Sequence, residues 1–475
     1  MSETPPAPAT VLPESLWRDR SFWGMTATQF LGAFNDNLFK QVVLLLCIDV
    51  AVQQGTRDYQ PQAQRLFALP FVLFSGFAGY LSDRYSKRRI AVLCKVFEIA
   101  IVALGTWSLS SGSLSAVFII LFCMGTHSAF FGPAKYGILP ELVREPNLPV
   151  ANGIFLMTTF VGIIVGTMLA GRLKGFVDEN IVLVGTAYVA VAVTGLTTSL
   201  LIRKTPVAHP GLTFAWSDLV VSGQTLRMFW RDKPLLLALI MYSVFWLIGG
   251  LTQSTVNVYG KLQVFGHLGI KEADAAASLM LGFLVIGIAL GCVTAGWISG
   301  NKVNFRLVPW GAWGMVVGLG LLSTVGWLGT ARESADPFSA VATPVDSPAQ
   351  TGAALAPHEA GPLLSPGAVD GASKLLLMLM GIAAGVFTVP LQVFLQSRPP
   401  SDQKGRVIGA MNLVNWIGIL FSAEIYSAFD LIRGELHAPH SAIFGGTALL
   451  LLPVALLYRP RATPRPDARQ VVTIH

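Results

Sequence analysis

Twelve apolar stretches follow one another along the 475 residues of this chain, and each is long enough to cross a lipid bilayer as a helix. The chain is 53% hydrophobic and only 12% charged, whereas roughly a quarter of the residues of a soluble domain are charged. The sequence therefore predicts an all-α membrane protein with twelve transmembrane helices. The expected spans are approximately residues 22–50, 64–83, 89–110, 114–141, 148–172, 181–203, 234–261, 272–300, 305–329, 373–398, 404–429 and 440–460.

Polar segments divide the spans into two groups of six. The expected parts are an N-terminal tail at 1–21, a bundle at 22–203, a linker at 204–233, a second bundle at 234–460 and a C-terminal tail at 461–475. The N-terminal tail lacks an apolar core and a cleavage site, so we do not expect it to be a signal peptide. Residues 330–372 are rich in Ala, Pro, Gly and Ser, which predicts a disordered loop.

Basic residues collect on one side of the expected spans, in clusters at 84–89, 203–204, 227–233 and 459–461. Because cytoplasmic loops carry an excess of Lys and Arg, both termini are expected in the cytoplasm. This asymmetry accounts for the net charge of +7 without a nucleic-acid partner. The linker places Trp216, Trp230 and other apolar residues among basic ones, which predicts an interfacial helix and offers a docking surface for a cytoplasmic enzyme.

Asp36 and Lys135 are ionisable residues inside apolar stretches. A charge at bilayer depth is costly unless it is paired or faces water, so both are candidates for a functional site. Two interpretations stay open. The two residues bind a substrate in a polar cavity, or they neutralise each other and lock span one to span four. Lys40 lies one helical turn from Asp36 and is a competing partner.

Three further charged residues lie within the spans. Lys95 and Glu98 are three residues apart in span three, and Glu424 lies in span eleven. A local ion pair on one helix face is one interpretation of Lys95 and Glu98. The other is a carboxylate that takes up and releases a proton and so couples transport to a proton gradient.

The loop between spans two and three resembles the signature loop of the major facilitator superfamily. Its matching residues are Gly79, Asp83, Arg84, Lys87, Arg88 and Arg89. The segment 78–82 also has a counterpart at 295–299 in the second group of spans. The resemblance implies two pseudo-symmetric six-helix bundles with the substrate site between them, and a role for this loop in conformational switching. Glycine would allow close helix approach, and Asp83 would cap or pair with a neighbouring helix end.

A narrower resemblance is to the lysophospholipid transporter family, which is related to the transporter domain fused to bacterial 2-acylglycerophosphoethanolamine acyltransferases. The matching segments are Gln29-Phe30-Leu31, Phe34-Asn35-Asp36-Asn37, Pro133 to Leu139, Ala151-Asn152-Gly153 and Val389-Pro390-Leu391. The family flips lipids such as lysophosphatidylethanolamine across the inner membrane of Gram-negative bacteria, where they are re-acylated.

The resemblance implies that Asp36, Asn37 and Lys135 bind the substrate headgroup, and we add Asn35, Lys40 and Gln29 to the candidate site. A zwitterionic headgroup needs one anionic and one cationic partner, which Asp36 and Lys135 can supply. The chain departs from the family at span seven. A basic residue expected there is absent, and Gln253 lies near its place.

A proton-coupled drug or small-molecule exporter of the same superfamily is the alternative. Such exporters usually have a glycine-rich motif with a proline in span five. This chain has Gly162, Gly166, Ala170 and Gly171 there, but no proline. Plain helix packing is the other interpretation of these small residues.

An enzyme is not expected, because the chain has neither the His-x-x-x-x-Asp signature of acyltransferases nor a P-loop. The cysteine spacing suggests no metal site, and we expect no cofactor. A separate acyltransferase/acyl-carrier-protein synthetase would have to perform re-acylation. A passive scaffold that recruits such an enzyme is a third possibility, and it would tolerate loss of the Asp36 carboxylate.

Overall fold

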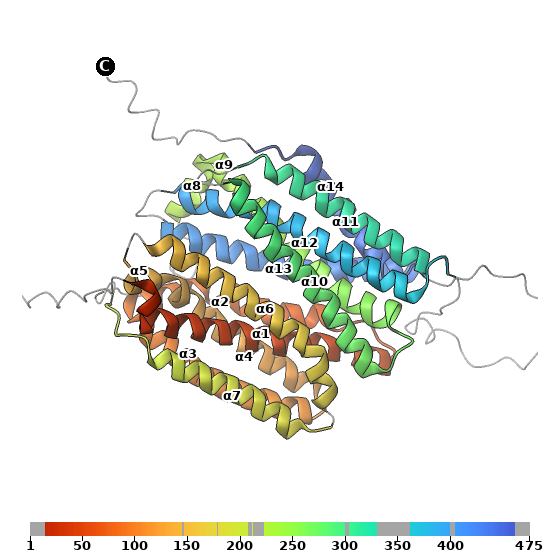
Figure 1. Ribbon diagram of the computed structural model, residues 1–475, viewed down its shortest axis with the longest axis horizontal. Coiled ribbons are helices and arrows are strands. Elements are labelled where there is room, and N and C mark those ends of the chain that lie inside the picture. The colour runs from red at the N-terminus through yellow and green to blue at the C-terminus, as the bar shows by residue number, and fades with distance from the viewer. Residues whose placement is uncertain are drawn as a thin grey trace, which may run out of the picture.

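The structure is a computed structural model that describes residues 15–144, 147–177, 179–207, 211, 223–299, 304–329, 362–399 and 404–460. The described residues form two helical bundles that lie side by side, one coloured red to yellow and the other green to blue (Figure 1). We call them the N-half and the C-half. Of the predicted linker, residues 204–207, 211 and 223–233 are described, and α8 (Gly223–Arg231) lies in the last of these stretches.

The N-half contains six long helices and a short one. They are α1 (Arg20–Gln54), α2 (Gln60–Arg84), α3 (Lys87–Ser110), α4 (Leu114–Gly137), α5 (Leu139–Leu142), α6 (Leu148–Val177) and α7 (Ile181–Leu200), preceded by the single turn η1 (Leu16–Arg18). The C-half contains α9 (Lys233–Val258), the π-helical turn η4 (Tyr259–Val264), α10 (Ile270–Ser299), α11 (Leu307–Gly329), α12 (Pro366–Ser397), α13 (Lys404–Glu435) and α14 (Ala442–Leu457).

The prediction of twelve membrane-spanning helices is confirmed. In the described part of the chain, eleven helices are long and apolar enough to span a membrane, and α14 is a shorter apolar helix. Successive spans run in alternate directions, so α1 begins and α14 ends at the same end of the bundle. We call that end the termini face and the other end, where α1 connects to α2, the opposite face. Figure 1 shows α5 and α8 at the termini face.

One predicted segment differs from the structure in its bounds. The predicted disordered loop was expected to reach residue 372, but α12 begins at Pro366 because the Ser365 hydroxyl caps it by accepting a hydrogen bond from the Ala368 amide. Residues 330–361 of that loop lie outside the described residues. In the predicted linker, Trp216 also lies outside them. α8 is amphipathic, since Phe229 is buried and Trp230 is exposed.

Small residues let α6 approach α1 closely in the N-half. A Cβ added at Gly162 would lie 2.9 Å from the Phe30 carbonyl oxygen, and one added at Gly166 would lie 2.6 Å from that of Phe34. Larger residues would therefore push the two helices apart. The glycines of span five thus act in helix packing, and the contact holds the part of α1 that contains Asp36.

Candidate functional site

A cavity of about 390 Å³ lies between the two halves, at mid-depth in the bundle. Its N-half wall comes from α1, α2, α4 and α6, and its C-half wall comes from α9 to α13. Of the six residues predicted to bind substrate, five line the cavity: Gln29, Asp36, Asn37, Lys40 and Lys135. This is the location that the repeat of two halves predicts for a transported substrate.

The charged groups of the cavity all come from the N-half. Asp36 Oδ2 accepts a hydrogen bond of 2.5 Å from Ser128 Oγ, and Oδ1 has no hydrogen-bond partner among the described residues. Lys135 Nζ donates to Thr159 Oγ1 at 3.3 Å. The structure does not contain the direct ion pair between Asp36 and Lys135 that was the alternative interpretation. Each charge is held by a neutral hydroxyl, which a charged ligand group can replace.

Lys40 is a third charge on the same wall. Its Nζ donates to Gln253 Oε1 on α9 at 3.2 Å and lies 5.4 Å from the centroid of the Phe67 ring. Gln253 is the residue near which the family resemblance led us to expect a basic side chain. Lys40 therefore brings a cation from α1 to the place where span seven lacks one.

Asn35 does not line the cavity, so its assignment to the binding site is wrong for this structure. The side chain is fully buried, and Nδ2 donates to Glu98 Oε1 at 3.2 Å. Adjacent residues on a helix point about 100° apart, so Asn35 faces α3 when Asp36 faces the cavity. Gln29 lines the cavity, where Nε2 donates to Thr158 Oγ1 at 2.6 Å and Oε1 accepts from Thr159 Oγ1 at 2.6 Å.

Lys95 and Glu98 form a local ion pair, as one interpretation predicts. Lys95 Nζ lies 2.5 Å from Glu98 Oε2, and both side chains are buried between α1, α3 and α4. Gly32 makes room for the ammonium, because an added Cβ would lie 2.5 Å from Nζ. Glu424 is also in an ion pair, but at a more exposed place. It is half-exposed, pairs with Arg65 of α2 at 2.5 Å and does not line the cavity.

The C-half wall of the cavity is mainly apolar. It presents Phe245, Trp246, Leu281, Leu284, Val285, Ile288, Met315, Met380, Trp416 and Ile419, with Thr252, Gln253, Asn412 and Asn415 as its main polar groups. Trp416 also stacks on Phe71 of the N-half, with ring centroids 3.6 Å apart and an interplanar angle of 11°. One cavity therefore offers a charged wall and an apolar wall.

Four charged residues join the halves near the opposite face. Asp49 and Lys174 come from the N-half, and Lys261 and Asp274 from the C-half. Lys261 lies 2.5 Å from Asp274 Oδ1, Lys174 lies 2.6 Å from Asp274 Oδ2, and both lysines also contact Asp49. We name these four residues the cross-half cluster. Each lysine bridges an aspartate of its own half and one of the other.

Polar contacts between the halves continue from this cluster toward the cavity. Gln41 donates to Asn257 Oδ1 at 2.7 Å, and Asn257 donates to Gln60 Oε1 at 2.8 Å. In the connection between α1 and α2, Asp58 Oδ2 accepts a hydrogen bond of 2.8 Å from the Tyr426 hydroxyl. Burial raises the pKa of Asp58 to about 6, although hydrogen bonds from Gln60 and Tyr426 lower it. The structure is therefore closed at the opposite face.

Three ion pairs near the termini face each stay within one half. Lys87 pairs with Glu141 and Arg203 with Asp19 in the N-half, and Arg398 lies 2.5 Å from Asp232 in the C-half. The signature loop lies at this face. Asp83 and Arg89 are exposed, the backbone N–H of Arg88 donates to Thr205 Oγ1 at 3.3 Å, and a Cβ added at Gly79 would meet no atom within 4 Å. Among the described residues, this state shows neither the expected helix-end contact of Asp83 nor a close approach at Gly79.

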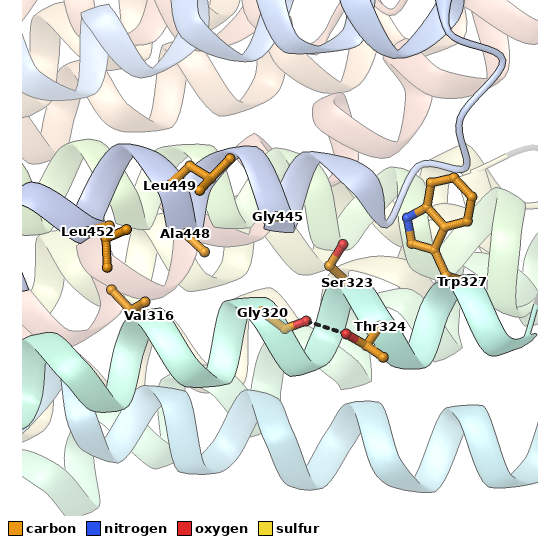
Figure 2. A pocket seen from close by; sticks show the side chains of 9 residues that line it. All are labelled: Val316, Gly320, Ser323, Thr324, Trp327, Gly445, Ala448, Leu449 and Leu452. Carbon is orange, nitrogen blue, oxygen red and sulfur yellow. Dashed lines mark hydrogen bonds between the residues drawn. The ribbon is translucent and has the colours of Figure 1, made fainter.

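A second hollow, of about 570 Å³, lies between α11 and α14 (Figure 2). Small and apolar side chains line it, including Val316, Ala448 and Leu449. Thr324, one of its polar residues, donates its hydroxyl to the Gly320 carbonyl at 3.0 Å. Because no charged side chain lines this hollow, it does not suit a charged headgroup, and the central cavity is the candidate site.

The sequence of this chain matches the profile of the Major Facilitator Superfamily over residues 62–423. The chain belongs to this superfamily. Solved structures of the same fold include a mutant of the nucleoside transporter NupG and a D-xylose-proton symporter, with TM-scores of 0.62 and 0.63 at 13% identity. They cover 91% and 93% of this chain and 99% and 98% of their own.

Curated relatives of this facilitator carry the name lysophospholipid transporter LplT. The protein of Enterobacter sp. (strain 638) is 28% identical over 87% of this chain and 89% of its own length. Those of Escherichia coli (strain K12 / DH10B) and Serratia proteamaculans (strain 568) are 28% and 25% identical, over 88% and 86% of this chain and 92% and 88% of their own lengths.

The sequence analysis did not identify several residues that line the cavity or close the opposite face of this facilitator. Ser128, Thr159 and His127 line the cavity from helices that otherwise look apolar, and single hydroxyls or imidazoles in such helices are common. Asp274 and Lys261 lie near predicted span ends, where charged residues usually contact water. Only the structure shows that Asp274 meets Lys174 of α6 and that Lys261 meets Asp49 of α1.

Proposed function

We propose that this facilitator transports lysophospholipids, such as lysophosphatidylethanolamine, across the membrane. The observation that carries the proposal is the division of one cavity into a charged wall and an apolar wall. A lysophospholipid has the same division, because a charged headgroup is joined to a single acyl chain. The similarity to proteins named lysophospholipid transporter supports this substrate class.

The headgroup is bound by the N-half wall. A substrate ammonium pairs with Asp36, whose Oδ1 is unpartnered among the described residues, and the phosphate pairs with Lys135 and Lys40. A group of opposite charge attracts Asp36 or Lys135 more strongly than the neutral hydroxyls of Ser128 and Thr159 do, so substrate can displace these hydroxyls. Lys40, held at Gln253, replaces the missing cation of span seven. Asn37 and Gln29 line the same wall and add hydrogen-bonding groups.

The acyl chain lies along the C-half wall. Removing a methylene from water contributes about 0.8 kcal/mol, so an apolar wall holds the chain while the headgroup crosses. In this orientation the two halves rock around the bound lipid in alternating access.

The termini face is cytoplasmic in this proposal, because the basic clusters lie on that side. The structure then represents the state closed to the outside. The protein lies in a bacterial inner membrane, and a separate acyltransferase/acyl-carrier-protein synthetase re-acylates the delivered lipid. The signature loop, with Asp83 exposed at the termini face, gains its helix-end contacts when that face closes.

The test is uptake of labelled lysophosphatidylethanolamine into re-acylated lipid, in cells that lack their own transporter. We expect uptake with the wild type and a loss of about tenfold or more with Asp36→Asn or Lys135→Met, because each removes an ionic headgroup contact. The matched control is Lys374→Met. Lys374 pairs with Asp370 on its own helix at 2.7 Å and lies outside the cavity wall. Expression and thermal stability are compared for all variants.

Absence of uptake by a well-folded wild type would refute the lysophospholipid assignment and make the small-molecule exporter the next function to test. Normal uptake by both cavity variants would leave the substrate class in place and refute the binding roles of Asp36 and Lys135. A scaffold would also give normal uptake with both variants, and in that case uptake would persist in cells without the protein.

A further inference from the structure

Asn415 of α13 is a buried polar residue in the otherwise apolar C-half wall. It lines the cavity and is 7% exposed, and its Oδ1 has no hydrogen-bond partner among the described residues. A buried acceptor without a partner is costly, so such an atom needs an explanation. A ligand that donates a hydrogen bond from within the cavity would supply the missing partner.

Two other buried polar atoms of this wall, Trp246 Nε1 and Thr252 Oγ1, are unpartnered among the described residues, but both differ from Asn415 Oδ1. The Thr252 hydroxyl has a local acceptor, because it can rotate toward the Ile248 carbonyl one helical turn earlier. The Trp246 indole N–H only donates. Asn415 Oδ1 accepts, and inside α13 the backbone N–H groups are used by the helix itself. Its donor must therefore come from outside the helix.

The packing of α13 on α9 fixes the position of Asn415. Ser243 Oγ donates to the Val414 carbonyl at 2.7 Å, and a Cβ added at Gly418 would lie 2.6 Å from the same Oγ. On the other side of α13, Asn412, Asn415 and Ile419 follow at helical spacing and line the cavity. A polar group that its helix already holds in place loses little freedom when a ligand binds, which favours specific recognition.

Asn415 also lies close to the charged wall. The ring of Trp416, the next residue, lies 5.8 Å from the Phe67 ring between centroids, and Lys40 Nζ lies 5.4 Å from the same Phe67 centroid. In the proposed orientation the headgroup occupies the N-half wall and the acyl chain follows the C-half wall. The glycerol that joins them then lies where the two walls meet, within reach of Asn415.

The free hydroxyl of this glycerol distinguishes a lysophospholipid from a diacyl phospholipid. A hydroxyl donates a hydrogen bond, whereas the acyl ester that replaces it in a diacyl lipid donates none. The substrate ammonium is the other donor, but anionic Asp36 attracts it more strongly than a neutral amide does. The glycerol hydroxyl is therefore the donor that suits Asn415 Oδ1.

We propose that Asn415 accepts a hydrogen bond from the free glycerol hydroxyl and so makes the cavity selective for lysophospholipids over diacyl phospholipids. This inference rests on the proposed function for the class of ligand. A site built to bind a substrate hydroxyl rejects an analogue without it, because the buried polar group of the site is left unpaired. Asn415 is then a specificity-determining residue in a wall that otherwise holds the acyl chain.

The test compares the binding of lysophosphatidylethanolamine with that of its 2-deoxy analogue, in which hydrogen replaces the glycerol hydroxyl. Dissociation constants are measured with the purified protein in lipid nanodiscs. We expect the wild type to bind the deoxy analogue about tenfold more weakly. Asn415→Leu has a similar volume and should bind the two ligands alike, whereas Asn415→Asp keeps an acceptor oxygen and should keep the preference. A merely structural role would weaken the binding of both ligands to the same extent.

Asn412→Leu is the matched control, because Asn412 lies one turn away on the same face of α13 and is only partly buried. It should keep the preference for the hydroxyl, and its loss there would overturn the assignment to Asn415. Equal binding of both ligands by the wild type, or a preference that survives in Asn415→Leu, would overturn the inference and leave the proposed function in place. If neither ligand bound to the wild type, the proposed function would fail, and the inference with it.

Discussion

Two buried groups of charges are built differently in this molecule. The pair of Lys95 and Glu98 lies within the N-half, whereas the cross-half cluster of Asp49, Lys174, Lys261 and Asp274 joins the halves. When two halves move as rigid bodies, contacts inside one half persist and contacts between them break. The first group therefore belongs to the fold in every state, and the second belongs to the state closed at the opposite face.

The largest expected effect is on the pair inside the N-half. Lys95→Met leaves Glu98 buried and unpaired, and removal of one partner of a buried pair destabilises a protein by about 3–5 kcal/mol. We expect a large drop in the thermal unfolding temperature of the purified protein. The unfolding temperature is measured by fluorescence-detected size exclusion. The change should be the same whichever face is open, because the pair does not cross between the halves.

The matched control is the double substitution Lys95→Met with Glu98→Met. Replacing a buried ion pair by apolar residues of similar volume is often neutral or stabilising, so the double variant should unfold at a higher temperature than Lys95→Met. If the double variant were as unstable as the single one, packing rather than charge would explain the loss.

The sequence was sufficient for the fold and for most of one cavity wall. Apolar length predicted the spans, and charges at bilayer depth identified Asp36 and Lys135. It was insufficient for the C-half wall, because Trp246 and Leu281 look like any other apolar residues until two helices are placed opposite α1. It also assigned Asn35 to the cavity, since neighbouring residues of a matched segment point to different sides of a helix.

The cross-half cluster is expected to give the next largest effect, on conformation rather than on folding. Lys261→Met leaves Asp49 and Asp274 to share Lys174, and opening would expose the unpaired charge to water. We expect a shift of about 1–3 kcal/mol toward the state open at the opposite face, which is about 5-fold to 150-fold in population. The measurement is maleimide labelling of a cysteine introduced at Asn257, after replacement of Cys47, Cys94, Cys123 and Cys292.

Lys271→Met is the matched control for that experiment. Lys271 pairs with Glu179 across the halves, but both side chains are about half-exposed, and exposed pairs contribute about 0.2–1 kcal/mol. Labelling of Lys271→Met should therefore rise little above that of the parent protein, and the rise should be smaller at high salt. Equal labelling of Lys261→Met and Lys271→Met would mean that the buried cross-half cluster stabilises the closed state no more than an exposed ion pair does.

The smallest expected effect is a pH dependence of closure at Asp58, which lies outside the spans and contacts Tyr426 of the other half. Burial raises its pKa from 3.8 to about 6 in the closed state, and opening returns it toward the value in water. The closed state thus binds the proton more tightly. Its stability is greatest at low pH and is lost as the pH rises from about 4 to about 6. Between pH 7 and pH 5 we expect labelling of the cysteine at position 257 to fall by about tenfold relative to Asp58→Asn, which cannot titrate at this position. The two proteins are compared at each pH because maleimide reacts with the thiolate, whose fraction falls with pH in both of them. A ratio that does not change between the two pH values would assign the proton of closure to another group, such as a member of the cross-half cluster.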